Sequence, residues 1–272
     1  MPGRILVVAQ QKGGSGKTTL AAHLAVAHAA MRRVAILDVD PQGSLGQWFE
    51  RRERRLGEGA TGLEMRTASG WGAKREARLL ARDHDLVLID MPPRSDLEAR
   101  NVIEAADLVV VPVQPTPVDL WATEATLELG RAAASAGVRR FVYLSSIKAL
   151  TDAFDGPPLT EEMQPAPDDP YGCSKLAAER GLAEIDLDWV ALRPVLIYGP
   201  GVKANMAALL KLARLPVPLP FGGLKAPRSL LAVENLVSAI LFALTPACPA
   251  RQSYALSDPE PISVSGMLAA MR

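Results

Sequence analysis

The chain has few of the features that mark secreted, membrane or highly charged proteins. Its 272 residues include two cysteines, too few for a disulfide framework, which favours a reducing, cytoplasmic setting. Its 30 basic and 30 acidic side chains cancel to a net charge of zero, which argues against a surface built for nucleic acid or membrane. A cluster of four arginines within 51–55 is interleaved with glutamates and predicts a solvated helix face.

Long apolar runs are also missing. The run Ile5–Ala9 is too short for the core of a signal peptide. The run Leu236–Leu244 is interrupted by Ser238 and has about half the length that a membrane span needs. We therefore expect a soluble, cytoplasmic protein.

Short apolar runs alternate with longer helical stretches along the whole chain. Near-continuous runs of Val, Ile and Leu are typical of parallel strands that are covered on both faces. The predicted strands are Ile5–Ala9, Val34–Leu37, Leu86–Ile89, Leu108–Val113, Phe141–Leu144 and Val190–Val195. The predicted helices are Thr18–Ala30, Asp96–Ala105, Thr116–Ala136 and Lys175–Ile185. This order predicts a three-layer α/β/α sandwich with a doubly wound, mostly parallel sheet, and two Pro-rich stretches, Asp152–Pro170 and Leu215–Pro227, are predicted to be surface loops.

The first half contains a glycine-rich loop between a predicted strand and a predicted helix, the context that a phosphate-binding loop requires. The loop has the sequence Lys12-Gly13-Gly14-Ser15-Gly16-Lys17-Thr18-Thr19. Its glycines let backbone N–H groups face an anion at the helix N-terminus. Lys17 would neutralise phosphate charge, and the Thr18 hydroxyl is placed to ligate Mg²⁺. The alternative is a glycine-rich turn that binds nothing.

Lys12 makes this loop resemble the deviant Walker A motif of the ParA/MinD family of ATPases. Two segments extend the resemblance: Asp38-Val39-Asp40-Pro41-Gln42-Gly43 is similar to the family's second acidic motif, and Leu86-Val87-Leu88-Ile89-Asp90-Met91-Pro92-Pro93 to its Walker B strand. The resemblance covers roughly residues 3–127. It implies ATP or ADP with Mg²⁺ as ligands, Asp40 as the residue that orients or activates the attacking water, and Lys12 reaching across a dimer to the partner's ATP.

The predicted metal set is Thr18, Asp38 and Asp90. Asp38 has bland alternatives, a helix N-cap or a surface acid. It also lies 22 residues after Gly16, where it could mimic the ribose-binding acid of a dinucleotide fold. The Lys17-Thr18 pair fits a triphosphate with Mg²⁺ better.

After about residue 128 the ParA/MinD pattern stops, and the residues from Ala136 to Ser146 look like the central strand of an extended short-chain dehydrogenase/reductase. Tyr171 and Lys175 supply a Tyr-x-x-x-Lys pair on one helix face, 25 residues after Ser146. With the segments Leu192–Gly201 and Arg228–Val233, the resemblance covers residues 131–265 and is strongest to the NAD-dependent nucleotide-sugar epimerase/dehydratase branch. It implies Tyr171 as acid/base, Lys175 as the residue that lowers its pKa and holds the cofactor ribose, and Ser146 as the group that polarises the substrate oxygen.

One motif of the dehydrogenase/reductase family is missing from this sequence. The family binds its nicotinamide cofactor with an N-terminal Gly-x-x-Gly-x-x-Gly loop, and this sequence has none. Gly13, Gly14 and Gly16 have the spacing of a phosphate loop instead. We therefore do not expect NAD, and we interpret Ser146, Tyr171 and Lys175 as a vestigial dehydrogenase set.

Each half resembles a fragment of a larger α/β unit. Phosphate-loop proteins of this kind order their core strands 2-3-1-4-5, and Rossmann dehydrogenases order them 3-2-1-4-5-6, so strands 1, 4 and 5 are neighbours in both. The predicted helix Thr116–Ala136 spans the joint, with Gly137 as a suitable C-cap. We expect a single hybrid domain over 1–272, made of a ParA/MinD-like half, 1–130, and an epimerase-like half, 131–272.

The function expected from these motifs is that of an engineered chimera whose phosphate loop binds ATP or ADP with Mg²⁺, with hydrolysis weak or absent. The alternatives are an NAD-dependent epimerase or oxidoreductase, a ligand-free test of fold recombination, and a natural ParA-like ATPase. The expected partner is a nucleotide, with no membrane and no nucleic acid. The expected state is a monomer or a nucleotide-dependent homodimer.

Overall fold

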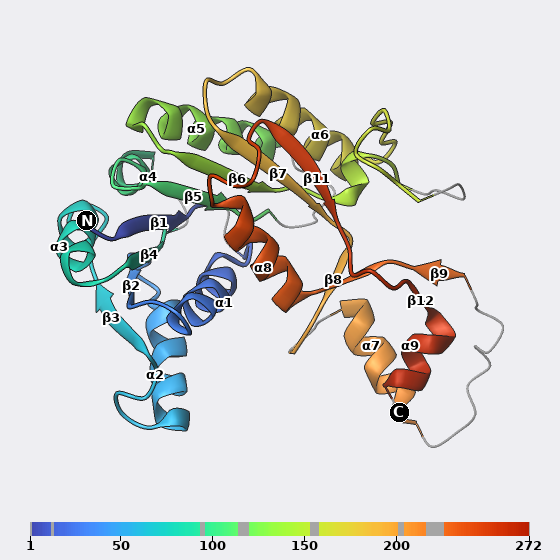
Figure 1. Ribbon diagram of the computed structural model, residues 1–272, viewed down its shortest axis with the longest axis horizontal. Helices are drawn as coiled ribbons and strands as arrows, with labels where there is room; N and C mark the ends of the chain where they lie inside the picture. The colour runs from blue at the N-terminus through green and yellow to red at the C-terminus, as the bar shows by residue number, and fades with distance from the viewer. Residues whose placement is uncertain are drawn as a thin grey trace.

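An eight-stranded sheet includes strands from both halves of the chain (Figure 1). The computed structural model describes residues 2–11, 14–92, 96–113, 120–152, 158–200, 204–215 and 226–271. The strand order is β11-β7-β6-β5-β1-β4-β2-β3, and each neighbouring pair is parallel. The strands are β1 (Arg4–Val8), β2 (Val34–Asp38), β3 (Leu63–Thr67), β4 (Leu86–Asp90), β5 (Leu108–Val111), β6 (Arg140–Leu144), β7 (Trp189–Pro194) and β11 (Gln252–Leu256).

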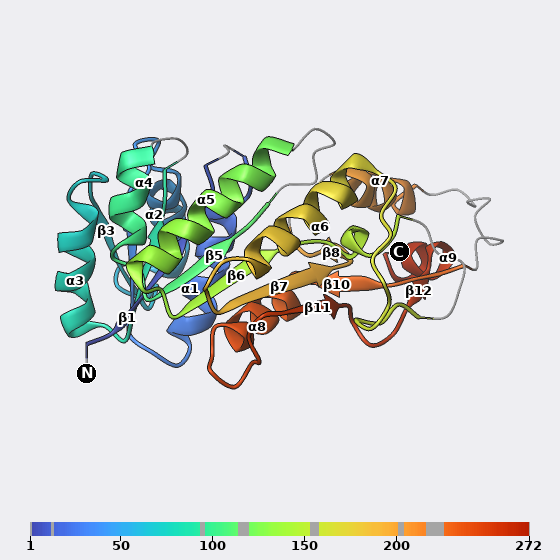
Figure 2. The same cartoon turned by 90° about the horizontal axis from the view of Figure 1, so that it is seen from above.

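Helices cover both faces of this sheet, which gives the three layers visible in Figure 2. One face packs against α3 (Ala73–Asp83), α4 (Asp96–Ile103), α5 (Leu120–Ala136) and α6 (Pro170–Ala183). The other face packs against α1 (Lys17–Ala29), α2 (Ser44–Leu56) and α8 (Val233–Ala243). Within the described ranges, no helix has the length and apolarity needed to cross a membrane. The prediction of a doubly wound, mostly parallel α/β sheet is confirmed.

The order of the strands around β1 follows the phosphate-loop pattern. β1 lies between β4 and β5, and β2 lies beyond β4. The core strands β1, β2, β4, β5 and β6, counted from one to five, are therefore arranged 2-3-1-4-5. The register is continuous across the joint, because Val8 pairs with Val110 and Val110 with Val142. The expectation that the fifth core strand lies beside the fourth is confirmed.

The helix that spans the joint ends as predicted. Gly137 has a φ of +72°, and its N–H donates to the Ala134 carbonyl at 3.1 Å while the Val138 N–H donates to the Ala133 carbonyl at 3.0 Å. These are the bonds of a glycine C-cap, so the predicted role of Gly137 is confirmed. The predicted start of this helix, 116–119, lies outside the described residues.

Helices α5 and α6 pack closely because glycines lie between them. A Cβ on Gly130 would lie 2.9 Å from Leu182 Cδ2, and one on Gly181 would lie 2.6 Å from Leu127 Cδ2. A side chain at either position would require Leu182 or Leu127 to move. The packing of α6 onto α5 therefore favours small residues at both contact points.

Several elements differ from the predictions or were not among them, including the edge strand β11 and the helices α3 and α8. α6 begins at Pro170, five residues before the predicted start, because the Asp169 side chain caps it by accepting the Gly172 N–H at 2.5 Å. The edge strand β3 was not predicted, because it is half exposed and carries no apolar run. The predicted loop at 152–170 has neither helix nor strand over its described residues 158–169, and 216–225 of the other predicted loop lie outside the described residues.

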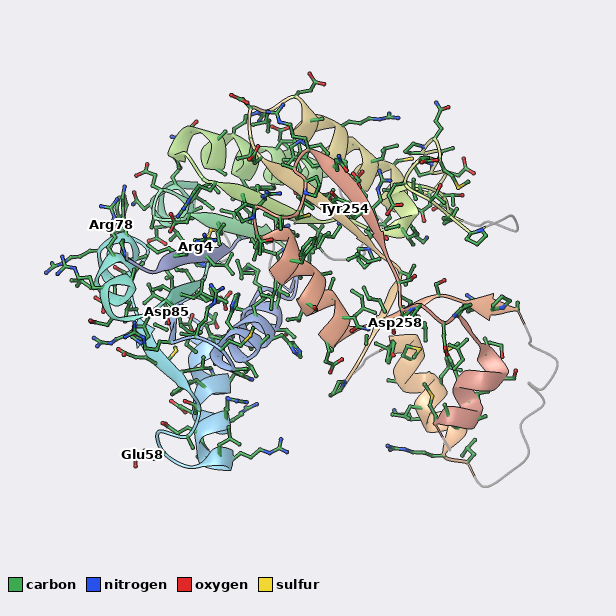
Figure 3. The ribbon with its side chains drawn as sticks, viewed as in Figure 1. Arg4, Glu58, Arg78, Asp85, Tyr254 and Asp258 are labelled. Carbon is green, nitrogen blue, oxygen red and sulfur yellow. The ribbon has the colours of Figure 1, made fainter. Side chains whose placement is uncertain are left out.

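A small lobe extends from the carboxyl end of β7 (Figure 1). Met206, Leu230 and Met267 form its core. Asp258, labelled in Figure 3, joins the lobe to the sheet by accepting hydrogen bonds from Tyr198 Oη at 3.0 Å and Asn235 Nδ2 at 2.7 Å. Its elements are β8 (Leu196–Tyr198), α7 (Ala204–Ala213), β9 (Pro227–Arg228), β10 (Leu230–Ala232), β12 (Ile262–Ser263) and α9 (Val264–Ala270).

The arginines of α2 lie on a solvated helix face, as predicted. Arg51, Arg54 and Arg55 are exposed, and Arg54 forms an i,i+4 ion pair with Glu50 at 3.3 Å. Arg52 lies over the Trp48 ring, 6.0 Å from its centroid. The cluster is therefore an ordinary amphipathic helix surface.

His28 on α1 makes the fold sensitive to acid. Burial, with a smaller contribution from Arg32, lowers its pKa to about 4. Because the unfolded chain holds this proton more tightly, stability falls as the pH drops from 6.5 towards 4. We expect His28→Gln to raise the free energy of unfolding by about 1–2 kcal/mol at pH 5, with a much smaller effect at pH 8. Urea unfolding at both pH values measures this, and an equal effect at both would contradict it.

Candidate functional site

The described part of the loop between β1 and α1 contains two glycines with positive φ. Gly14 and Gly16 have φ values of +77° and +85°, a region that glycine adopts readily and other residues rarely. Gly16 is the N-cap of α1, and no side chain caps this helix. A helix N-terminus of this kind presents N–H groups and the positive end of the helix dipole. Lys12 and Gly13 lie outside the described residues.

A buried carboxylate lies beside this loop. Asp90 ends β4, is 0 % exposed and accepts a hydrogen bond from Thr18 Oγ1 at 2.6 Å through Oδ2. Its Oδ1 is buried and has no hydrogen-bond partner within the described part of the chain. Burial raises the pKa of Asp90 to about 7; the Thr18 bond and Lys17 oppose this, and the charges of Asp38 and Asp40 add to it.

Lys17 and Asp38 are buried next to Asp90. Burial lowers the pKa of Lys17, and the carboxylates of Asp90 and Asp40 oppose this shift. Asp38 pairs with Asp90 across the β2–β4 register and accepts hydrogen bonds from the backbone N–H groups of Asp40 at 3.1 Å and Gly46 at 3.0 Å. Because Gly46 is in the first turn of α2, Asp38 also supports the start of that helix, but the N-cap is Gly43. Asp38 is 2 % exposed, so neither the N-cap nor the surface-acid alternative describes it.

The structure therefore brings together predicted site residues from three separate segments, Lys17 and Thr18 from α1, Asp38 and Asp40 from the end of β2, and Asp90 from β4. Ser15 is buried, and its Oγ has no hydrogen-bond partner among the described residues; Thr19 is exposed.

These residues fit a polyphosphate with Mg²⁺. An unpartnered buried carboxylate oxygen beside a threonine hydroxyl is a suitable place for a hard cation, and Mg²⁺ commonly uses one or two carboxylates together with substrate phosphates. No group of three or more His, Cys, Asp or Glu side chains in the described ranges could hold a metal on its own. A Mg²⁺ ion bound at Asp90 would therefore complete its coordination with other oxygen ligands, such as water or phosphate.

The second predicted set is also assembled at the carboxyl edge of the sheet. Ser146 lies two residues after the end of β6, and its side chain hydrogen-bonds Tyr171 on α6. Burial raises the pKa of Tyr171, and the bond from Ser146 partly offsets that rise. Lys175 is 1 % exposed, with its Nζ 5.2 Å from the Tyr171 ring centroid and 5.3 Å from that of Tyr143.

The buried ion pair between Glu179 and Arg193 was not predicted from the sequence. Glu179 on α6 and Arg193 on β7 are 4 % and 5 % exposed, and Arg193 Nη2 donates to Glu179 Oε2 at 2.5 Å. The signal available in the sequence was an arginine in an otherwise apolar strand, because a buried cation requires an acidic partner.

Two cavities lie away from both clusters. One, of about 530 Å³, lies between α4 and α5 and is lined in part by Gln11, Arg100 and Glu128. The other, of about 480 Å³, is lined in part by Arg4 and Gly137 at the amino edge of the sheet. Neither is lined by the residues of the two predicted sites.

Comparison with known families places the fold in context. The model of the NAD dependent epimerase/dehydratase family matches residues 42–255. The chain belongs to this family. The model of the ATPase MipZ matches residues 4–78, so a chain of the epimerase family also carries ParA/MinD-like sequence in its first part, as the resemblance predicted. The epimerase match begins at residue 42, well before the predicted 131, and the two matches overlap over 42–78.

Proteins of both kinds are among the relatives of this chain. A UDP-glucose 4-epimerase of Vibrio cholerae is 38 % identical over 152 residues, 54 % of this chain and 46 % of that protein. A Maintenance of carboxysome distribution protein A of Gloeobacter kilaueensis is 37 % identical over 145 residues, 53 % of this chain and 63 % of that protein. The chain thus spans about half to somewhat under two thirds of these relatives.

A solved structure supports the fold alone. The Bordetella bronchiseptica enzyme WbmG, in a complex with NAD, aligns with a TM-score of 0.58 and 17 % identity over 99 % of this chain and 77 % of that one.

Proposed function

We propose that the β1–α1 loop binds ATP or ADP together with Mg²⁺. The observation that carries the proposal is the buried Asp90, whose Oδ1 has no hydrogen-bond partner among the described residues and lies beside the Thr18 hydroxyl at the start of α1. The phosphates would lie against the N-terminus of α1, with Lys17 neutralising part of their charge. Mg²⁺ would be held by Thr18 and Asp90, with Asp38 adding negative charge beside it.

Charge balance supports a cation at this place. Among the residues that the structure describes, the cluster has one lysine and three carboxylates, and burying unpaired charges is costly. A divalent cation would offset the excess negative charge and allow Asp90 to stay ionised at neutral pH. The phosphates would then bring their own charge to the cation and to Lys17.

Hydrolysis is expected to be weak or absent. By resemblance, Asp40 would orient or activate the attacking water and Lys12 would act across a dimer, so the chain would be a monomer or a nucleotide-dependent homodimer. The matches cover only 63 % and 52 % of two ParA-like relatives, so this chain repeats only part of the sequence that would support such a dimer.

A competing function, that of an NAD-dependent epimerase or oxidoreductase, is favoured by the family match and by the assembled Ser146, Tyr171 and Lys175. The residues at the β1–α1 loop do not fit NAD as that family binds it, because the Gly-x-x-Gly-x-x-Gly spacing is missing. We therefore propose no hydride chemistry at Tyr171.

The shared sheet supports a proposal for the origin of the chain. We propose a single hybrid domain, with 1–130 from a ParA/MinD-like protein and 131–272 from an epimerase-like protein, joined within α5. Natural fusions usually join complete units through linkers, whereas here both fragments share one sheet. This favours an engineered chimera.

Titration calorimetry with ATP and Mg²⁺ tests the binding proposal. We expect a saturable heat for the parent protein and an affinity at least about 100-fold lower for Lys17→Ala, since a charge-assisted phosphate contact in a buried site is lost. Lys74→Ala, a lysine paired with Glu104 on the surface, is the control and should bind as the parent does. Equal heats for the parent and Lys17→Ala would end the proposal, and saturable NADH fluorescence would favour the epimerase function.

A further inference from the structure

We propose that Glu179 is a positioning residue that holds Tyr171 against Ser146. The proposal concerns the second cluster and is independent of nucleotide binding at the β1–α1 loop. It rests on hydrogen bonds that tie one helix to three neighbouring strands.

The carboxylate of Glu179 gathers donors from β6, β7 and β11. It accepts hydrogen bonds from Ser145 Oγ at 2.5 Å and from Ser253 Oγ at 3.1 Å. Arg193 Nε donates to both carboxylate oxygens at 3.1 Å, and Arg193 Nη2 donates to Oε2 at 2.5 Å. Ser145 directly follows β6, while Arg193 and Ser253 lie on β7 and β11. This one side chain therefore fixes α6 over three adjacent parallel strands.

The same face of α6 carries Tyr171, Lys175 and Glu179, which follow one another at intervals of four residues. At 1.5 Å per residue, Glu179 lies about 12 Å along the helix from Tyr171. A shift of α6 along its axis or a rotation about it would move both residues together. The position of Tyr171 thus depends on where Glu179 is held.

Adjacent serines connect the two ends of this arrangement. Ser145 donates to Glu179, and Ser146 hydrogen-bonds Tyr171. Two neighbouring residues of one segment therefore contact the same helix at two points. If the hydrogen bond between Ser145 and Glu179 is lost, the position of α6 along its axis is no longer fixed there. The contact between Ser146 and Tyr171 is then less well defined.

The first turn of α6 is held separately. Asp169 caps it and pairs with Lys148, and a Cβ on Gly172 would lie 2.3 Å from the Lys148 carbonyl oxygen. These contacts keep the helix folded and close to the 3-10 turn η1 (Ile147–Ala149). Loss of Glu179 is therefore expected to loosen the Tyr171–Ser146 contact without removing the helix.

A double-mutant cycle read at Tyr171 tests the proposal. The four tyrosines are labelled with ¹³C at Cζ, the Tyr171 signal is assigned with Tyr171→Phe, and its titration midpoint is followed in the parent, Ser146→Ala, Glu179→Gln and the double variant. We expect either single substitution to raise the midpoint by about half a pH unit or more, because a bond that favours the phenolate is weakened. The double variant should show little further change.

Control variants distinguish a positioning role of Glu179 from an effect on the stability of the whole protein. Asp258→Asn removes a carboxylate with several hydrogen bonds from the lobe junction and should leave Tyr171 unchanged. If Glu179→Gln does not fold, Ser253→Ala removes one of the Glu179 contacts and should give a smaller shift of the same sign. Additive effects of Ser146→Ala and Glu179→Gln, or no effect of Glu179→Gln or Ser253→Ala on Tyr171, would overturn the proposal.

Discussion

Replacing Asp90 by asparagine is expected to stabilise the ligand-free chain at pH 8 and to remove its Mg²⁺-dependent nucleotide binding. Asparagine has nearly the same shape and can still accept the Thr18 hydroxyl through Oδ1. It carries no charge, so the cost of burying a carboxylate beside Asp38 disappears. The same change removes the oxygen charge that a cation would need.

The pH dependence follows from the sign of the shift. Burial raises the pKa of Asp90 from 3.8 to about 7. Between these values the folded state holds a proton that the unfolded state has lost, so the parent loses stability as the pH rises through this window. We expect Asp90→Asn to raise the free energy of unfolding by about 3 kcal/mol at pH 8 and by about 1 kcal/mol at pH 5.

Urea unfolding at the two pH values, paired with calorimetry, measures both halves of this prediction. Asp85→Asn is the matched control, because Asp85 is exposed just before β4 (Figure 3) and its pKa is lowered, mainly by the Arg33 backbone N–H. It should give no gain at pH 8. A loss of stability for Asp90→Asn at pH 8, or unchanged Mg²⁺-dependent binding, would contradict the assignment.

Replacing Arg193 by methionine is expected to cost about 3–5 kcal/mol of folding free energy, since it leaves the buried Glu179 carboxylate without its charge partner. Both groups are almost fully buried, and Arg193 makes three of the hydrogen bonds to Glu179. The contributions of Ser145 and Ser253 cannot balance a full negative charge. The loss should be seen as a lower midpoint in urea unfolding.

The paired replacement Glu179→Leu with Arg193→Met should recover most of this loss, because two apolar side chains of similar size can occupy the space of a buried ion pair. If the double variant were as unstable as Arg193→Met alone, packing at this position and not the unpaired charge would explain the loss. The exposed pair Arg251–Asp186, at 2.8 Å, is the control; its loss should be within about 1 kcal/mol.

The arrangement of the main sheet could be predicted because most of its strands are short apolar runs that can be recognised in the sequence. Runs such as Leu86–Ile89 and Val190–Val195 are apolar on both faces, and this pattern belongs to buried parallel strands. The end of α5 was also predictable, since Gly137 is a suitable C-cap and has the positive φ of one. β3 could not be predicted from the sequence, because its residues are half exposed and mixed in polarity.

The candidate site was predictable where chemistry is encoded within a few residues. The loop from Lys12 to Thr19 and the acids that end β2 and β4 each follow a strand, so the topology brings them together. The Glu179–Arg193 pair was not predictable in this way. Its members lie 14 residues apart on a helix and a strand, and only the packing of α6 onto β7 shows that they meet.

A crystal structure of the protein soaked with ADP and Mg²⁺ shows whether the β1–α1 loop holds a nucleotide. We expect phosphate density against the N-terminus of α1, Lys17 in contact with it, and a cation between Thr18 and Asp90. Phosphate density at another place, or an empty loop under saturating nucleotide, would contradict this expectation.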